Sequence, residues 1–337
     1  MMEDVVQLTA RMMEIDSTSG REGALVDWVE NYLGGADWRV RRIPVTPGRD
    51  DLLATSIDAP LVTLSTHLDT VPPFIPPRLD GDRLHGRGAC DAKGIAASMI
   101  LAADALRARG VPVALLFVVG EEVTHDGASA ANAVATTSRV LINGEPTEST
   151  LALGTKGAMR FTLRTTGRAA HSAYPQYGTS AIAELVRLLA ELETLDLPRD
   201  DVLGDTTINI GTIGGGVADN VMAPAAEARL MARLVTPAEE LASLLRKWVG
   251  QRASFEQSIT VPPVRLGTLE GFPTSVAAYA TDIPKLSNWG TPYLFGPGSI
   301  HYAHRDDEHV MVAELRDAVR QYERLALAAL AALERAR

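Results

Sequence analysis

The sequence has a single cysteine, Cys90, and no long hydrophobic run. One cysteine cannot form a disulfide within the chain, and one thiolate cannot build a structural zinc site, so any metal must be held by histidine and carboxylate side chains. The longest apolar stretches are about ten residues, which is too short to cross a bilayer. The N-terminal residues carry acids early and lack an apolar core followed by a cleavage site, so we expect no signal peptide. Together these absences predict a cytoplasmic protein.

Positive charge is also scarce, since 32 Lys and Arg residues stand against 42 Asp and Glu residues, for a formal net charge of −10. This balance argues against binding to nucleic acid or to an anionic membrane surface. Hydrophobic residues make up 46% of the 337 residues and charged residues 22%, close to the averages of globular proteins. The length predicts about two domains.

Helices alternate with buried strands through the first half of the sequence. Apolar runs at 60–65, 113–119 and 139–142 are typical of buried strands, and 96–109 has the pattern of a helix. Ser19 and Glu22 form the pattern of a capping box at the start of another helix. Strands separated by helices predict an α/β domain with a mixed, mostly parallel sheet and helices on both faces.

The pattern changes after Gly157, where apolar and polar residues begin to alternate as in a strand with one exposed face. The expected elements are in order a strand, a helix, two strands, a helix and a last strand, and the first five lie at 159–165, 179–195, 206–213, 227–234 and 236–250. The α/β pattern then returns, with a strand at 292–295 and a long helix at 312–337. We therefore predict a catalytic domain in two parts, 1–157 and 263–337, interrupted by a small α+β domain, 158–262.

Histidine and carboxylate residues follow three of the predicted strands. They are His67, Asp69, Glu121, Glu122 and Glu145. Ligand sites of open α/β sheets lie beyond the carboxyl ends of the strands, and carboxylates beside a buried sheet are costly unless a cation compensates them. Asp91, just before a predicted helix, and His304, near the end of the chain, extend the set.

These residue types indicate metal-assisted hydrolysis. Neutral imidazole and carboxylate ligands suit zinc, cobalt or manganese. Two histidines and three carboxylates are enough for two metal ions that share one carboxylate and lie roughly 3.5–4 Å apart. A further carboxylate can be the general base for the attacking water. Because Glu121 and Glu122 are adjacent, we expect their side chains to diverge, so that one binds metal and the other faces the substrate.

Five ordered motifs make the sequence resemble the zinc-dependent family of acetylornithine deacetylase, succinyl-diaminopimelate desuccinylase, aminoacylase and related carboxypeptidases. The motifs are His67-Leu-Asp69, Gly86–Gly94, Glu121-Glu122, Gly144-Glu145-Pro146 and Ala303–Glu308. The similarity extends through almost the whole chain and is strongest to acetylornithine deacetylase-like members. For the inserted domain, it implies an α+β sandwich that acts as lid and dimerisation domain.

The resemblance implies a site for two Zn²⁺ ions per chain, which Co²⁺ or Mn²⁺ can replace. His67 and Glu145 would hold one ion. Glu122 and His304 would hold the other, and Asp91 would bridge the two.

Two further acids of the catalytic domain receive roles from the same resemblance. Glu121 would be the general base and acid, and Asp69 would orient His67. The peptide between Asp91 and Ala92 corresponds to one that is often cis in the family.

Residues of the inserted domain complete the implied site. His171 matches the family's lid histidine, which helps to bind the scissile carbonyl, often from a neighbouring subunit of a homodimer. Asn220 and Arg233 are candidates for binding the substrate carboxylate, since an arginine fork suits that planar group, and Lys156 is a further candidate. His125 and His301 match no role in the family.

The sequence thus predicts a co-catalytic di-zinc hydrolase of linear amide bonds that removes an acyl group, expected to be acetyl, from an Nα-acyl amino acid. Acetylornithine, acetylcitrulline, acetyl-lysine and a carrier-linked lysine or ornithine remain open as substrates, which places the enzyme in arginine or lysine biosynthesis. A di- or tripeptidase or a desuccinylase of the same family is the alternative, and a non-catalytic binding relative is the second alternative.

Overall fold

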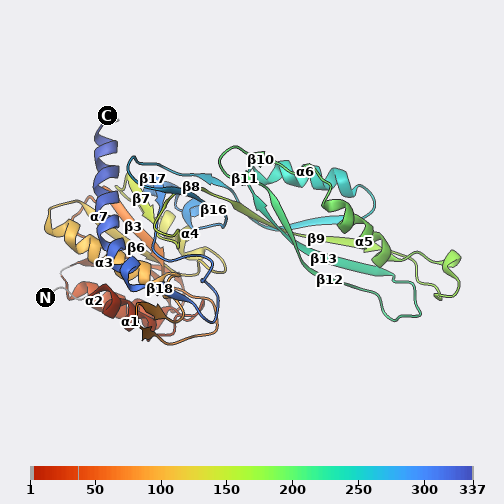
Figure 1. Cartoon of the computed structure of the whole chain (residues 1–337), viewed down its shortest axis with the longest axis horizontal. Coiled ribbons are helices and arrows are strands. Elements are labelled where there is room, and N and C mark those ends of the chain that lie inside the picture. Colours follow the sequence, from red (N-terminus) through yellow and green to blue (C-terminus); the bar gives the residue numbers. More distant parts are fainter. Residues whose placement is uncertain (1–3, 37, 336–337) are drawn as a thin grey trace. The chain divides into compact units, whose positions relative to one another are not determined.

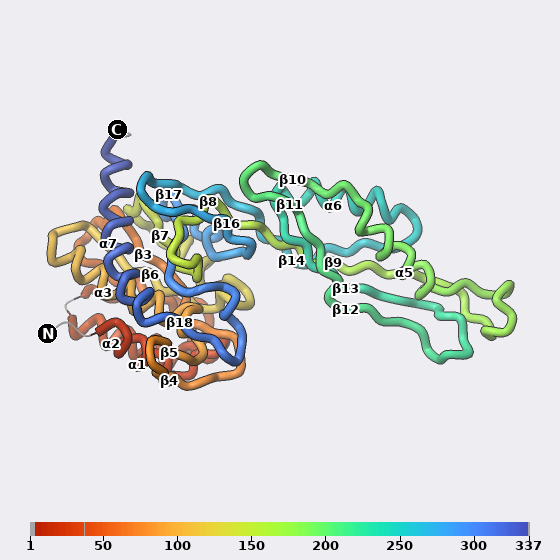
Figure 2. Tube along the Cα trace, in the orientation of Figure 1, coloured from red at the N-terminus to blue at the C-terminus, as the bar shows by residue number. Residues whose placement is uncertain are grey.

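The computed structural model describes residues 4–36 and 38–335. The chain forms two compact units, and it runs from the first into the second and back again (Figure 2). The first unit comprises Met1–Leu153, Leu266–Ser275 and Thr281–Arg337, and the second comprises Gly154–Arg265 and Val276–Ala280. The domain limits predicted from the sequence, 158 and 262, lie within a few residues of these, while the short return at Val276–Ala280 was not expected.

The first unit is built on a six-stranded sheet with the strand order β1-β2-β6-β3-β7-β17 (Figure 1). Its strands are β1 (Arg39–Thr46), β2 (Arg49–Thr55), β3 (Val62–His67), β6 (Val113–Val118), β7 (Val140–Asn143) and β17 (Thr291–Leu294). The last four are parallel, whereas β1 pairs antiparallel with β2, and β2 with β6. The mixed, mostly parallel sheet confirms the predicted fold class.

Helices cover both faces of this sheet. On one face lie α1 (Val5–Met13), α2 (Gly23–Gly34), α3 (Lys93–Ala108) and α7 (Val312–Arg335), and on the other lies α4 (Asp126–Asn132). Successive residues of β6 enter opposite cores, Leu115 the first and Leu116 the second, because side chains alternate along a strand. A strand buried on both faces must be apolar throughout, which explains the continuous run at 113–119. The predicted end of the last helix, Arg337, lies outside the described residues.

Short elements complete the first unit and the chain segments that connect the two units. They are β4 (Arg78–Asp80), β5 (Arg83–His85), β8 (Leu151–Thr155), β15 (Val264–Arg265), β16 (Thr274–Ala277), β18 (His309–Met311), η2 (Ile283–Lys285) and η3 (Ser287–Trp289). Strands β18, β5 and β4 form one three-stranded sheet, and β15, β8 and β16 form another.

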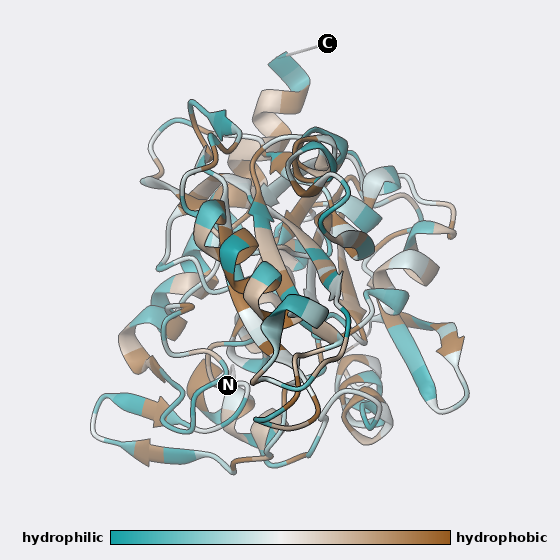
Figure 3. Ribbon diagram, turned by 90° about the vertical axis from the view of Figure 1, so that its right-hand side faces the viewer, coloured by the Kyte–Doolittle hydropathy of each residue, from teal (hydrophilic) through white to brown (hydrophobic). Residues whose placement is uncertain are grey.

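The second unit has a four-stranded antiparallel sheet with the order β12-β13-β9-β14 and two helices. The elements are β9 (Gly157–Thr166), η1 (Pro175–Tyr177), α5 (Ala181–Leu192), β10 (Arg199–Asp200), β11 (Gly204–Asp205), β12 (Thr207–Gly215), β13 (Ala225–Leu234), α6 (Ala238–Val249) and β14 (Ser254–Val261). Met159, Phe161 and Leu163 of β9 enter one core with α5 and α6. Colouring by hydropathy shows apolar and polar residues recurring in turn along the helices, as this layering requires (Figure 3). The alternating pattern predicted after Gly157 is confirmed.

The helix predicted to start with a capping box is present, but its local cap is not. The helix α2 begins at Gly23, and its N-cap residue, Glu22, makes no capping hydrogen bond. The Ser19 hydroxyl instead donates to Asp69 at 2.8 Å, and the Glu22 carboxylate accepts from Arg49 at 3.0 Å. Distant partners thus replace the local hydrogen bonds of the expected box. No helix within residues 4–36 and 38–335 is long and apolar enough to cross a membrane.

Candidate metal centre and active site

Three neighbouring parallel strands bring the predicted residues to one edge of the sheet. Strand β3 ends at His67, Glu121 and Glu122 follow β6, and Glu145 follows β7. Because β3 pairs in parallel with both β6 and β7, the carboxyl ends of all three strands meet at that edge. The position agrees with the general rule for ligand sites in open α/β sheets.

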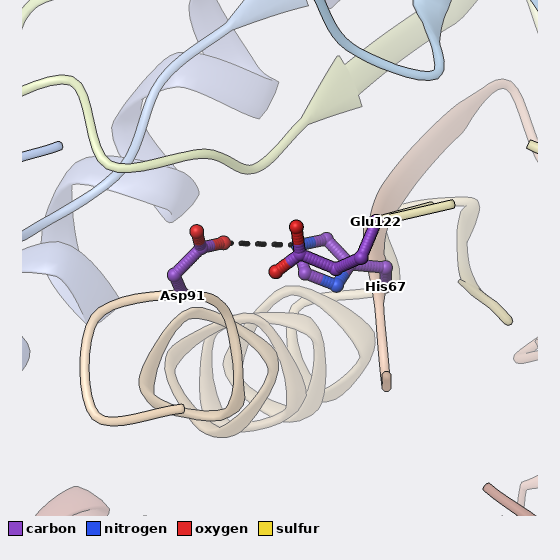
Figure 4. Close-up of side chains that lie close together, drawn as sticks. All are labelled: His67, Asp91 and Glu122. Carbon is purple, nitrogen blue, oxygen red and sulfur yellow. Dashed lines mark hydrogen bonds and ion pairs between the residues drawn. The ribbon is translucent and has the colours of Figure 1, made fainter. Parts of the chain in front are cut away.

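Asp91 faces two histidines with its two carboxylate oxygens. Its Oδ1 atom lies 3.0 Å from Nε2 of His67, and its Oδ2 atom lies 3.2 Å from Nε2 of His304. The side chain is placed just before α3, and the Asp91–Ala92 peptide is cis, as the family resemblance implied. Figure 4 shows Asp91 and Glu122 converging on His67, and ligand atoms of these three residues all lie within 4.8 Å of one another.

The remaining two predicted ligands complete a pair on each side of Asp91. Glu122 lies 3.0 Å from Nε2 of His304, and Glu145 lies 4.0 Å from Nε2 of His67. Imidazole nitrogens and carboxylate oxygens in this proportion suit zinc, cobalt or manganese. The structure therefore brings all five predicted ligands together, in an arrangement that fits one cation on each side of the Asp91 carboxylate.

Asp69 holds the turn that carries the two adjacent glutamates. Its carboxylate accepts the backbone N–H of Glu121 at 3.0 Å and that of Glu122 at 3.2 Å. The ring of His67 is oriented mainly through the Asp69 backbone carbonyl, 2.9 Å from Nδ1, whereas the carboxylate lies 3.5 Å away. Asp69 is thus beside His67 as predicted, but its side chain acts chiefly on the Glu121–Glu122 turn.

Burial raises the pKa of Glu121, Glu122 and Glu145, and neighbouring carboxylates add to the rise. Such groups are costly to ionise together in a dry site unless a cation is close. A carboxyl whose pKa is raised toward the working pH is also suited to move protons.

The pKa values of the two histidines are raised as well, but here the cause is the negative charge around them. Hydrogen bonds to Asp91 and Glu122 raise the pKa of His304 to about 10. Burial alone would lower the pKa of His67, but Asp69 and Asp91 overcome that effect, and the pKa lies well above its usual value. The imidazolium charges in turn hold the pKa of Asp91 below its usual value against the effect of burial. Without a metal ion, these shifts favour protonation of the same two imidazoles that are proposed as metal ligands.

These shifts predict that bound metal and pH control the stability of the protein together. Groups whose folded-state pKa is raised stabilise the fold at low pH, and that stability is lost as pH rises through the folded pKa. For the metal-free protein this loss begins near pH 4.5 for the glutamates and near pH 6.5 for His304. We expect the melting temperature of chelated protein to fall between pH 6 and 9, while zinc-loaded protein changes little.

Thermal unfolding with and without a chelator measures this difference. Metal at about 100 times its dissociation constant adds about 2.7 kcal/mol, which corresponds to a shift of about 5 °C or more at pH 8. Metal uptake should release protons, because the ligands must lose them. Equal melting temperatures for chelated and loaded protein at pH 8 would contradict the expectation.

Glu308 is a site residue whose role the sequence did not reveal. Its Oε1 atom accepts the backbone N–H of Gly88 at 3.0 Å and that of Asp91 at 3.3 Å. Its Oε2 atom lies 2.6 Å from the guanidinium of Arg87, and both side chains are fully buried. Glu308 thus fastens the loop that presents Asp91. The buried acid in the last motif was the signal, but its partners lie more than 200 residues earlier.

The predicted residues of the second unit do not form one group, since His171 and Asn220 lie before the start of β13 and Arg233 lies near its end. His171 and Asn220 are exposed and close in the backbone, since His171 pairs with Val221 and the Asn220 carbonyl accepts the N–H of Ser172 at 2.9 Å. The Lys156 ammonium is already engaged, because it donates to the Asp205 carbonyl at 2.6 Å.

Arg233, on β13, is half buried, and no carboxylate pairs with it within the described residues. Burial and the nearby Arg160 lower its pKa. A guanidinium in this environment is a favourable place for an anionic ligand.

Comparisons with known proteins agree with these features. The peptidase dimerisation domain of the M20 type matches residues 153–255. A peptidase M20 domain-containing protein of Schizosaccharomyces pombe is 39% identical over 338 residues, which cover 96% of this chain and 84% of that protein. The chain belongs to the M20 peptidase family. It is therefore a hydrolase of the metallopeptidase type, although the narrower resemblance to acetylornithine deacetylase is not confirmed by these relatives.

Other known proteins are similar over nearly the whole chain. A protein of Paracoccidioides lutzii named as a probable carboxypeptidase is 37% identical over 378 residues, covering 97% of this chain and 85% of that protein. A tripeptidase of Staphylococcus aureus has the same fold, with a TM-score of 0.81, 18% identity, and 96% and 98% of the two chains covered. A dinuclear metal-binding M20 peptidase of Bacillus subtilis has a TM-score of 0.73, 15% identity and 96% of each chain covered.

Proposed function

We propose that this M20 family member is a two-metal hydrolase of an amide bond. His67 and Glu145 would hold one Zn²⁺, Glu122 and His304 the other, and Asp91 would bridge them. The observation that carries this proposal is the position of Asp91, whose two oxygens face two different histidines at 3.0 and 3.2 Å. Co²⁺ or Mn²⁺ would suit the same donors.

When bound, the ions would polarise the amide carbonyl and lower the pKa of water at the site. We assign the proton transfers to Glu121, which follows β6 beside the ligands and whose pKa is raised by burial. Its carboxylate takes a proton from the attacking water and delivers it to the departing amine. Asp69 keeps this side chain in place through the Glu121 backbone N–H. We assign to His171 a hydrogen bond to the oxyanion of the tetrahedral intermediate.

The substrate proposed here carries a free α-carboxylate next to the scissile amide nitrogen. Arg233 supports this, because it is half buried, has no carboxylate partner in the described part of the chain, and a guanidinium binds a carboxylate with two parallel hydrogen bonds. Asn220 would add a further contact. Lys156 is a weaker candidate, because its ammonium already donates to a backbone carbonyl.

Two substrate classes present that same bond, so they share one mechanism. An Nα-acyl amino acid such as acetylornithine, acetylcitrulline, acetyl-lysine or a carrier-linked amino acid fits the motif resemblance. A peptide cleaved at its last residue fits the probable carboxypeptidase of Paracoccidioides lutzii. We propose the deacetylase reaction, in arginine or lysine biosynthesis, as the first candidate, because the motifs support it. The carboxypeptidase reaction is the second candidate, because this relative supports it.

A turnover panel with zinc- or cobalt-loaded protein separates the candidates. It should contain acetylornithine, acetylcitrulline, acetyl-lysine, succinyl-diaminopimelate and a set of di- and tripeptides, with metal content measured on the same samples. Peptide turnover far above acetylornithine turnover would replace the first candidate by the second. Absence of hydrolysis, or of bound metal, for every member of the panel would contradict the hydrolase proposal itself.

We propose a homodimer formed through the second unit. The support is the match of residues 153–255 to a peptidase dimerisation domain. In this dimer we assign His171 to the metal centre of the partner subunit, as the family resemblance implies.

A further inference from the structure

His125 has no part in the chemistry described so far, yet its side chain lies beside the proposed general base. Nδ1 of His125 is 2.8 Å from Oδ1 of Asp282 and 3.8 Å from Oε1 of Glu121. Donor atoms of the three side chains all lie within 4.8 Å of one another. One ring nitrogen therefore faces two carboxylates, one of which is proposed to move protons.

The backbone around His125 explains why the ring turns back toward Glu121. Both Thr124 and His125 donate their N–H groups to the Gly120 carbonyl, at 3.0 and 2.8 Å. His125 adopts a left-handed conformation with φ of 53°, which is uncommon outside glycine, and the helix α4 starts directly after it. This closed turn places the imidazole on the carboxylate four residues earlier.

Asp282 gives the imidazole a fixed anchor. Its side chain is almost fully buried, with an exposed fraction of 2%, and a buried carboxylate needs a donor. Oδ1 of Asp282 and Nδ1 of His125 are within hydrogen-bond distance at 2.8 Å, and an ionised carboxylate would accept this bond from Nδ1–H. Asp282 precedes η2, whose first residue, Ile283, is also buried. The ring is thus held on one side by a buried part of the first unit.

We propose that Asp282 and His125 are a positioning pair for Glu121. Asp282 holds the ring of His125 through Nδ1 at 2.8 Å, and the ring packs against the Glu121 carboxylate, 3.8 Å from Oε1, which limits the directions that this carboxylate can take. The inference rests on the proposed function, because it assumes that Glu121 is the general base. Neither His125 nor Asp282 belongs to the five proposed metal ligands, and both act through Glu121 without touching the substrate.

Kinetics of Asp282→Asn and His125→Ala test the pair. Partners that orient a reacting group through another side chain typically contribute about 10–100-fold, so we expect kcat to fall by that factor. KM should change less than about twofold, since substrate binding does not use the pair. Asp282→Asn keeps the volume of the side chain, so it tests the pair even if His125→Ala fails to fold. His125→Asn, whose amide N–H can take the place of Nδ1–H, should restore part of the loss.

The matched control is Asn132→Ala. Asn132 lies on the same helix, α4, and links it to Ser287 at 3.2 Å and to the Asn288 N–H at 2.8 Å. This variant loosens the same helix against the same part of the chain without touching Glu121, so its kcat should stay unchanged. An equal loss of kcat in Asn132→Ala would show a general packing effect and overturn the inference.

A double-variant cycle checks that the pair acts through Glu121. In a Glu121→Asp background, whose shorter side chain is withdrawn from the ring, His125→Ala should cost much less than in the wild-type background. An equal fold-decrease of kcat in both backgrounds would overturn the inference. Loss of a third equivalent of zinc from His125→Ala would also overturn it, because the cluster would then be a metal site. Full activity of Glu121→Gln would instead overturn the proposed function. If Glu121→Gln is inactive but His125→Ala and Asp282→Asn keep the wild-type kcat, only the positioning pair is overturned.

Discussion

Replacing Glu121 with glutamine is expected to lower kcat by about 10³-fold while the protein still binds its metals. Glutamine keeps the size of the side chain but cannot accept the proton of the attacking water, and general base catalysis contributes about 10²–10⁴-fold. The backbone N–H of Glu121 that Asp69 accepts is unchanged by the substitution, so the turn should stay in place. KM should stay within about threefold, because the missing interaction is made in the transition state.

Steady-state kinetics on the best substrate of the panel, together with metal analysis, measure this effect. Glu14→Gln is the matched control, since Glu14 is an exposed glutamate at the end of α1. A kcat within tenfold of wild type would remove Glu121 from its assigned role. A large loss accompanied by loss of metal would make Glu121 a ligand instead.

The second large effect is expected on stability. Glu308→Gln removes the charge that compensates Arg87 in a fully buried ion pair with a 2.6 Å contact. Breaking such a pair by removing one partner costs about 3–5 kcal/mol, because the other charge stays buried without compensation. The Asp91 loop should also loosen, since Glu308 accepts its backbone N–H groups, and metal affinity should fall by about 10–100-fold.

Urea unfolding of the zinc-loaded and chelated protein, with metal titration, tests this expectation. Asp307→Asn is the control in the adjacent position. It removes a solvent-exposed ion pair with Arg305, 2.7 Å long, and should leave both stability and metal affinity unchanged. Unfolding free energies for Glu308→Gln within about 1 kcal/mol of wild type would contradict a structural role for the buried pair.

The fold, and the places of the proposed metal ligands at one edge of the sheet, were predictable because their signals are local or ordered along the chain. Apolar runs and alternation depend on the few residues of one element, so the strands ending near His67, Glu122 and Glu145 could be located within a few positions. Parallel strands that share a sheet must place their carboxyl ends together, which brings these side chains to one edge. Asp91 and His304 came from motifs rather than from any structural rule.

The roles of other residues depend on partners that no local pattern reveals. Ser19 and Glu22 fit a capping box, yet Ser19 bonds to Asp69, 50 residues away, and Glu22 pairs with Arg49. A local cap contributes about 1 kcal/mol, so a charged partner in a buried setting can displace it. Sequence reasoning on caps fails where tertiary contacts of this kind are available.

What the sequence alone determined was the class of fold, the likeness to metal-dependent amide hydrolases and the side chains that we propose as metal ligands, since periodicity and ordered motifs carry that information. Only the tertiary structure decided how those side chains are held. Glu308 meets the Asp91 loop across 220 residues of sequence, and His125 meets Asp282 across 157. The physical reason is that a buried carboxylate must find a donor wherever the folded chain places one, and that position exists only after the strands and helices have packed.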